Sequence, residues 1–310
     1  MKNTKIMCTG SGGHIFSNFI RRAIYQKLDY NFVSIDKVKK SNAINNFYTN
    51  KLHKFYIGDV ADSHFLNVIF EIERPDIVIH GAAELDDPNA FIHSNVTGTQ
   101  TIIDACLKWN IERFIYISDD GVYGRLKDDS EASWTESSPI NPVTFYAATK
   151  AAGELLVMKD GNKLPYNILR LCNSYGPRQT PTKFIPKSIK NILSDQSTII
   201  WGNGTNDIRD WTHVNDIYSA IIAVLNSGKI NDIYNVSAGQ EFTNIEVYQE
   251  ICNVLNKGHS LTVFSDAADV YRMATNSNKL KGIGWAPEYK FKNSIPEITN
   301  WYSSNQWALK

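Results

Sequence analysis

Apolar residues in the first half of the chain occur in short runs that alternate with longer segments of helical spacing. The short runs lie at residues 5–8, 32–36, 55–57, 77–80 and 114–117 and predict buried β-strands. The segments between them predict helices over 13–28, 62–73, 96–109 and from residue 146 onward. Buried strands separated by helices form parallel sheets with right-handed crossovers, so the pattern predicts a Rossmann-type, doubly wound α/β fold.

The second half of the chain returns once to this sheet and then builds a smaller lobe. The expected elements are a proline-rich loop over 177–186, a returning helix over 215–225, a returning strand over 233–236, and lobe helices over 243–255 and 294–302. We therefore expect a Rossmann domain of residues 1–170, to which 211–238 return. Residues 171–310 form a C-terminal α/β substrate lobe in this division.

Composition excludes several classes of partner. Lys plus Arg and Asp plus Glu each number 32, so the chain has no overall field that would attract nucleic acid. Its four cysteines are scattered without a CxxC pair, which predicts reduced thiols in a cytoplasmic protein with neither a disulfide framework nor a metal site. No apolar run approaches the roughly 18 residues of a membrane span, and Gly10 interrupts the start before a signal-peptide core.

A glycine-rich turn, Thr9–Phe16, separates the first strand from the first helix. Glycines here let backbone amides approach a pyrophosphate at the helix N-terminus. Asp36 ends the second strand, where a carboxylate accepts hydrogen bonds from an adenosine ribose and repels a 2′-phosphate. This favours NAD over NADP, although Lys37 acts in the opposite direction. The alternative is an ordinary strand-ending turn and a solvated aspartate.

Tyr146 and Lys150 are four residues apart in a predicted helix, so their polar ends share one face. An ammonium near a phenol lowers the phenol's pKa from its usual value of about 10. Tyr146 is therefore a candidate acid/base for proton transfer to or from a sugar or alcohol oxygen. The alternative is the start of an ordinary amphipathic helix.

These features belong to a longer series of motifs. They are TGSGGHIF, Asp36-Lys37, Gly58-Asp59-Val60, His80–Glu84, Asn95–Thr99, SDDGVYG, YAATK, Arg170–Pro177, Phe184–Pro186, Gly202–Gly204, Arg209–His213, Tyr234-Asn235, Gly284-Trp285 and Trp301-Tyr302. In this series the chain resembles extended short-chain dehydrogenases/reductases that act on nucleotide sugars, most closely the dTDP-glucose 4,6-dehydratases. The resemblance covers nearly the whole chain.

The resemblance implies NAD as cofactor, a nucleotide-diphosphate sugar as substrate, and a homodimer. The implied NAD-binding residues are Gly10, Gly13, His14, Ile15, Asp36, Asp59, Val60, Ala82, Ala83, Tyr146 and Lys150. The implied substrate-binding residues are Glu84, Asn173, Lys183, Arg209 and Arg272. For Arg209 the alternative is a surface ion pair with Asp207 or Asp210. The apolar faces of 96–109 and of the helix after Tyr146 resemble the dimer surface of the family, a four-helix bundle. Packing inside one chain explains these apolar faces equally well.

The chain departs from the family pattern at two places. Phe16 stands where the family keeps a third glycine, so its ring must push the helix outward or pack sideways, with weaker cofactor binding expected. The dehydratases read Ser-Thr-Asp-Glu before Val-Tyr-Gly, whereas this chain reads Ser118-Asp119-Asp120-Gly121. Asp120 keeps the place of the acid that protonates the departing C6 hydroxyl. Gly121 replaces the glutamate that removes the C5 proton, which leaves Asp119, a water or Glu84 as the base.

Three functions compete on these residues. The first is an NAD-dependent 4,6-dehydratase acting on a UDP- or dTDP-hexose, with UDP-N-acetylglucosamine as a candidate, and admitting C5 epimerisation because the base is displaced. The second is a nucleotide-sugar 4-epimerase, which needs Tyr146, Lys150 and NAD but no leaving-group acid. The third is a non-enzymatic nucleotide sensor, against which the intact Tyr146 and Lys150 argue. Retention of Asp120 favours the dehydratase.

Overall fold

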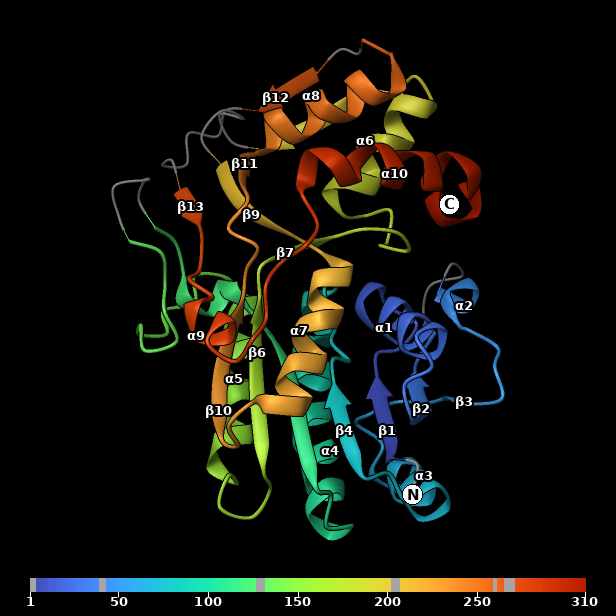
Figure 1. Cartoon of the computed structure of the whole chain (residues 1–310), viewed down its shortest axis with the longest axis vertical. Coiled ribbons are helices and arrows are strands. Elements are labelled where there is room, and N and C mark those ends of the chain that lie inside the picture. The colour runs from blue at the N-terminus through green and yellow to red at the C-terminus, as the bar shows by residue number, and fades with distance from the viewer. Residues whose placement is uncertain (1–3, 39–42, 127–131, 202–206, 259–260, 265–270) are drawn as a thin grey trace.

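A parallel sheet of seven strands forms the centre of the molecule, in the order β10-β6-β5-β4-β1-β2-β3 (Figure 1). This computed structural model describes residues 4–38, 43–126, 132–201, 207–258, 261–264 and 271–310. The strands of the sheet are β1 (Thr4–Thr9), β2 (Tyr30–Asp36), β3 (His53–Ile57), β4 (Ile77–His80), β5 (Arg113–Asp119), β6 (Tyr166–Leu171) and β10 (Asp232–Val236). The order reverses between β1 and β4, as in a doubly wound fold.

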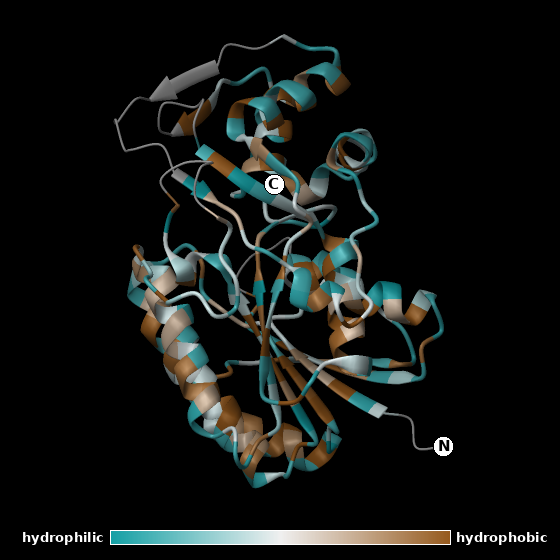
Figure 2. Cartoon of the chain, turned by 60° about the vertical axis from the view of Figure 1, so that its left-hand side comes forward, coloured by the Kyte–Doolittle hydropathy of each residue, from teal (hydrophilic) through white to brown (hydrophobic). Residues whose placement is uncertain are grey.

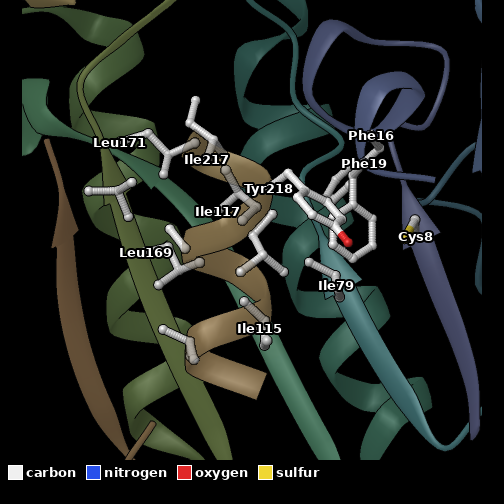
Figure 3. Close-up of a cluster of buried hydrophobic side chains, with 14 of the residues drawn as sticks. Cys8, Phe16, Phe19, Ile79, Ile115, Ile117, Leu169, Leu171, Ile217 and Tyr218 are labelled. Atoms are coloured by element: carbon white, nitrogen blue, oxygen red, sulfur yellow. The ribbon is translucent and has the colours of Figure 1, made fainter. Parts of the chain in front are cut away.

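Helices cover both faces of the sheet. One face carries α1 (His14–Tyr25) and α7 (Val214–Ser227), and the other carries α3 (Ser63–Glu73), α4 (Gly98–Lys108) and α5 (Phe145–Lys159). Alternate strand residues serve the two faces because side chains alternate along a strand. In β5, Ile115 and Ile117 pack toward α7, whereas Phe114 and Tyr116 pack in the opposite cluster. Figure 3 shows the first of these clusters, where Leu169 and Ile117 lie against Ile217 of α7.

A smaller lobe lies beyond the carboxyl ends of the strands (Figure 1). It contains α6 (Phe184–Leu193), β7 (Asn173–Tyr175), β8 (Thr198–Trp201), β9 (Asp207–His213), β11 (Glu241–Thr243), α8 (Asn244–Leu255), β12 (Leu261–Phe264), β13 (Tyr271–Met273), α10 (Phe291–Ser304) and the 3-10 turn η4 (Gln306–Leu309). Its own apolar cluster joins α6, α8 and α10 around Trp211. Figure 2 shows hydrophobic residues along the central strands and mixed surfaces on the helices outside them. The remaining short elements are α2 (Ala43–Asn46), η1 (Pro88–Ala90), the π-helical turn η2 (Ile92–Thr97), η3 (Asp120–Tyr123) and α9 (Asn278–Lys281).

The predicted elements of the large sheet are confirmed, with small differences at their ends. The strand predicted over 77–80 is β4 itself, and 233–236 returns to the sheet in β10, parallel to β6. The first helix ends at Tyr25 instead of residue 28. The loop predicted over 177–186 is wrong at its end, because α6 starts at Phe184. Pro186 is accommodated in its first turn, where a proline removes no helical hydrogen bond.

The division at residue 170 stays a prediction, and one segment of the expected substrate lobe packs on the large sheet. Leu280 and Trp285 belong to the cluster under α7. The Trp285 indole Nε1 donates to the Asp216 carbonyl at 3.1 Å and to the Ser219 hydroxyl at 3.0 Å. The chain therefore crosses between the two lobes more often than the two-part division states.

The thiol state of the cysteines and the length of the helices can be compared with the expectations from the sequence. Cys8, Cys106 and Cys172 are buried free thiols, and Cys252 is partly buried and also free. In the described ranges, no helix combines the length and the apolar character that crossing a membrane requires.

Candidate active site

A cavity of about 610 Å³ opens between the carboxyl ends of the strands and the smaller lobe. Among the predicted residues it is lined by Gly10, Gly13, His14, Ile15, Asp36, Val60, Ala82, Ala83, Glu84, Asp119, Tyr146, Lys150, Asn173, Lys183 and Arg209. The predicted residues outside its lining are Asp59, Asp120 and Arg272. Residues far apart in sequence thus meet at the edge where parallel strands end, as the fold requires.

The turn between β1 and α1 brings the backbone of Gly10 close to the backbone of Ala82. Gly10 has a φ of 76° and donates from its amide to the Ile35 carbonyl at 2.8 Å. A Cβ atom on Gly10 would lie 2.8 Å from the backbone N and Cα of Ala82, so only glycine fits. Gly13 is the N-cap of α1 and has no side chain to cap the first amides of the helix. These amides are available to an anion in the cavity.

Phe16 packs sideways into the core. It is 2% exposed, and its ring meets Phe19 edge-on with centroids 6.2 Å apart (Figure 3). Gly81 makes room for it, because a Cβ atom on Gly81 would lie 2.5 Å from the Phe16 ring. The ring therefore replaces the side chain that residue 81 lacks, and the turn from Gly10 to Gly13 is kept.

Asp36 faces the glycine turn from the end of β2. Its carboxylate accepts from the Gly12 amide at 2.9 Å and from the Val38 amide at 2.7 Å. Lys37 also lines the cavity, but its ammonium lies 2.9 Å from the Asp59 carboxylate. Asp59 thus sits just behind the lining, held by Lys37 and by His93 Nε2 at 2.9 Å, which is why its own side chain does not reach the cavity.

His80 fixes the loop after β4, a role that sequence reasoning missed. The Thr99 hydroxyl donates to the Asn95 carbonyl at 2.6 Å, so it accepts from His80 Nε2–H at 3.1 Å. His80 Nδ1 then accepts from the Thr9 hydroxyl at 2.6 Å. Burial, with the nearby Lys150 charge, lowers the pKa of His80 to about 3, so the ring stays neutral. Its position directly before the Gly-Ala-Ala-Glu motif is the signal that would have found it.

Tyr146 and Lys150 share the cavity-facing side of α5, whose N-terminus is capped by Thr144. The Lys150 ammonium donates to the Ile117 carbonyl at 2.6 Å and lies 4.2 Å from the centroid of the Tyr116 ring. Burial lowers the pKa of Lys150 to about 8. Burial and then the charge of Asp119 raise the pKa of Tyr146. The pKa of Tyr146 is therefore raised, opposite to the lowering expected from Lys150, because desolvation and the nearby carboxylates disfavour the phenolate.

The loop after β5 separates its two carboxylates. Asp119 caps the short turn η3, accepts from the Gly121 amide at 2.9 Å and lines the cavity. Asp120 is 4% exposed and lies behind the lining, beside Cys172, Arg209 and Asp210. Its Oδ2 atom has no hydrogen-bond partner among the described residues. Burial first, and then Asp119, raises the pKa of Asp120 well above its usual range, which favours the protonated acid.

A buried ion pair holds both ends of this loop, which sequence reasoning also missed. The Glu154 carboxylate accepts from the Ser118 hydroxyl at 2.6 Å and from Arg170 Nη2 at 2.6 Å. Arg170 Nη1 donates to the Tyr123 hydroxyl at 2.7 Å. Glu154 follows Lys150 by four residues, and this helical spacing is the signal that could have been used.

The predicted substrate residues divide into those that face the cavity and one that does not. Lys183 lies 3.9 Å from Asp86 across the cavity, and Arg209 lies 3.8 Å from Asp207 while still lining it. Glu84 is held by Asn95, whose side-chain oxygen accepts from the Glu84 amide at 2.7 Å. The Asn173 side-chain nitrogen is buried without a hydrogen-bond partner within the described ranges.

Arg272 is placed elsewhere. Its guanidinium forms a two-nitrogen ion pair with Glu241, with Nη2 2.6 Å from Oε1, and Nη2 also donates to the Ser133 hydroxyl at 3.1 Å. The assignment of Arg272 to the substrate is corrected for this reason. His213 is a buried core histidine: it caps α7, and its ring stacks on that of Tyr289 with the centroids 4.2 Å apart.

The chain is similar to proteins of one family along most of its length. Residues 6–237 match the sequence model of the NAD dependent epimerase/dehydratase family. The Low-salt glycan biosynthesis protein Agl12 of Haloferax volcanii is 32% identical, over 96% of this chain and 98% of its own. The dTDP-D-glucose 4,6-dehydratase of Homo sapiens is 32% identical, over 97% and 90%. The crystal structure of dTDP-glucose 4,6-dehydratase from Bacillus anthracis in complex with NAD superposes with a TM-score of 0.90 at 30% identity, over 98% and 97%.

Proposed function

Because this chain belongs to the NAD dependent epimerase/dehydratase family, we propose that it is an NAD-dependent nucleotide-sugar 4,6-dehydratase, a lyase of the extended short-chain dehydrogenase/reductase type. Its substrate is a UDP- or dTDP-hexose, and its product is a 4-keto-6-deoxy sugar. Support comes from relatives about 30% identical over nearly the full chain that bear this activity in their names. One observation carries the choice within the family: the buried Asp120, whose raised pKa favours the protonated acid, directly follows the cavity-lining Asp119.

The cavity fits NAD at three points. Gly10 leaves space for close backbone approach, the uncapped amides of α1 suit a pyrophosphate, and Asp36 suits a ribose hydroxyl. Bound there, NAD would supply a reversible hydride acceptor, which takes the hydride from C4 and returns it to C6 after water has left. Asp36 disfavours a 2′-phosphate, and Lys37 does not offset it because its ammonium is already paired with Asp59.

Tyr146 acts on the C4 oxygen of the sugar. Because the pKa of the Tyr146 phenol is raised, forming its phenolate needs a nearby positive charge. Lys150 provides this charge from the same helix face. The pKa of Lys150, about 8, keeps the ammonium mostly charged at neutral pH. Tyr146 then takes the proton of the C4 hydroxyl as the alcohol becomes a ketone.

Asp120 and Asp119 share the elimination of water across C5 and C6. Once C4 is a ketone, the C5 proton is acidic, and Asp119 is the carboxylate in the cavity that takes it. Asp120 gives its proton to the departing C6 hydroxyl. Asp120 lies beside Cys172 and Arg209, both of which line the cavity, so a rotation of its side chain would bring the acid to the sugar. Burial raises the pKa of both carboxyl groups, and the charge of Asp119 raises that of Asp120 further, a separation that suits a paired acid and base.

A nucleotide-sugar 4-epimerase is the second candidate, and Gly121 favours it because this position lacks a base. It uses Tyr146 and Lys150 without any leaving-group acid. Mass spectrometry and NMR of UDP- and dTDP-hexoses, UDP-N-acetylglucosamine included, incubated with the protein and NAD separate the two. Loss of one water supports the dehydratase, and a product of unchanged mass with a new C4 configuration refutes it.

The remaining proposals concern assembly and location. The outer side of α5 and of η2 exposes Leu155 (61%), Phe145 (52%) and Ile92 (51%), an apolar surface that fits a homodimer joined through a four-helix bundle. Leu155→Glu should then convert the dimer to a monomer in light scattering, whereas Ile230→Glu, at an exposed site after α7, should not. The free cysteines support a cytoplasmic location.

A further inference from the structure

A second hollow, of about 320 Å³, opens beside α1 and is lined by Arg21, Arg22 and Arg178. Within the part of the chain that the structure describes, none of the three guanidinium groups forms an ion pair with a carboxylate. Arg21 donates to the carbonyls of Asn46 and Phe47 at 3.1 and 2.9 Å. Among the described residues the hydrogen-bond acceptors of all three arginines are neutral groups, and the Asp216 carboxylate interacts electrostatically with Arg22 without forming an ion pair.

Aromatic rings hold these cations in place. The Arg21 guanidinium lies 4.8 Å from the centroid of Tyr48, and that of Arg178 lies 5.1 Å from Trp301. Arg22 lies 5.4 Å from Tyr218 and donates to the Tyr289 hydroxyl at 3.1 Å. Contacts of this kind orient a guanidinium without neutralising it. The three groups are therefore pre-positioned around one hollow.

Three guanidinium groups held close together repel one another, and an anion bound between them would relieve this repulsion. Burial, and then the charge of Arg21, lowers the pKa of Arg178 to about 10. The Nε atoms of all three arginines are buried and lack a hydrogen-bond partner among the described residues. The whole chain carries equal numbers of acidic and basic residues, so overall charge balance does not call for this local surplus.

We propose that this hollow binds a diphosphate group, at a site separate from the main cavity. A guanidinium fork matches two phosphate oxygens, and several forks around one hollow suit a diphosphate better than a single carboxylate. Of the lining residues, Arg178 alone is common to both sites. Tyr25, 85% exposed on the rim, offers a face for the nucleoside of a nucleotide. The proposal does not depend on the proposed enzymatic function.

The test is calorimetric titration of the NAD-saturated protein with inorganic pyrophosphate. Arg22→Gln should weaken binding about tenfold or more, because one charged donor is lost. Arg22→Lys, which keeps the charge, should weaken it less. Arg209→Gln removes an arginine from the main cavity, and Arg74→Gln removes one that stacks on Trp109 at the far end of α3. Arg74→Gln should bind pyrophosphate like the wild type, Arg209→Gln should leave the binding that depends on Arg22 in place, and unchanged melting temperatures should confirm that all four variants fold.

The outcomes decide the proposal. Absence of binding to the wild type, equal binding by Arg22→Gln, or loss of binding only in Arg209→Gln would overturn it, the last because pyrophosphate would then occupy the main cavity. Repeating the titration with ADP separates the two sources of a diphosphate. Tighter binding of ADP that depends on Arg22 supports a nucleotide site, and equal affinity that depends on Arg22 supports a site for the phosphates alone.

Discussion

The carboxylate of Asp119 occupies the place where a side chain on Gly121 would begin. A Cβ atom built on Gly121 would lie 2.7 Å from Asp119 Oδ1, the oxygen that accepts from the Gly121 amide. Ala147 limits the space on another side, with its Cβ 3.4 Å from the same point. The aspartate at 119 and the glycine at 121 are therefore one structural unit, and in our proposal the base stands two residues earlier in the loop.

A substitution at Gly121 alone should therefore lower turnover, and a matching substitution at Asp119 should restore part of it. Gly121→Glu forces Asp119 off the Gly121 amide and should lower kcat about tenfold or more, since base and acid are both displaced. The double variant Asp119→Thr with Gly121→Glu recreates the loop of the resembled dehydratases and should be more active than Gly121→Glu alone. Steady-state kinetics of the three proteins provide the check, and a fully active Gly121→Glu enzyme would contradict the coupling.

Tyr146→Phe should lower kcat by roughly 10²–10⁴ and leave the affinity for the nucleotide sugar nearly unchanged, because only the acid/base hydroxyl is lost. Turnover and calorimetric binding should be measured on the same preparation. Tyr166→Phe, which removes a hydroxyl at the far end of the sheet, serves as the control and should keep full turnover. An active Tyr146→Phe enzyme would remove this residue from the mechanism.

The fold could be predicted from the sequence because its signals are local. Buried runs such as 77–80, and the glycines of the turn from Gly10 to Gly13, are recognised from a few consecutive residues. The charged residues were harder, because their partners come from distant segments. Arg272 was assigned to the substrate, yet Glu241, 31 residues away, takes its guanidinium. No pattern of neighbouring residues predicts the pairing of Arg272 with Glu241.

The pKa values of the site depend on how deeply each side chain is buried, and a sequence does not give this burial. The spacing of Tyr146 and Lys150 correctly predicted that both face one cavity. It did not predict that burial and Asp119 would raise the pKa of Tyr146. The effect of Phe16 likewise depended on Gly81, 65 positions later, which makes room for the ring.

Asp36→Ala should weaken NAD binding and narrow the difference in affinity between NAD and NADP. The change removes a carboxylate that suits the ribose and that repels a 2′-phosphate. Fluorescence titration with both cofactors measures the effect, with Asp104→Ala, exposed on α4, as the control. Unchanged affinities for both cofactors in Asp36→Ala would exclude Asp36 from the site.

The stability of the protein should depend on pH through Asp120. Because burial and Asp119 raise its pKa, the folded protein keeps a proton that the unfolded chain loses above about pH 4. Wild-type stability therefore falls as the pH rises from there toward the folded-state pKa, and Asp120→Asn removes this loss. The variant's free energy of unfolding, relative to the wild type, should grow by about 1.4 kcal/mol per pH unit in that window. Urea unfolding at several pH values measures it, with the exposed Asp104→Asn as control. Parallel curves for wild type and Asp120→Asn would show that Asp120 titrates normally.

The central claim, elimination of water with Asp119 as base and Asp120 as acid, is tested most directly by running the reaction in deuterated water. Product mass and C5 configuration are read by mass spectrometry and NMR, for the wild type and for Asp119→Ala. We predict loss of one water, one deuterium at C5, strongly reduced turnover in Asp119→Ala, and a C5 centre that is inverted or mixed because the base is displaced. A product of unchanged mass, or full activity of Asp119→Ala together with complete retention at C5, would contradict the account.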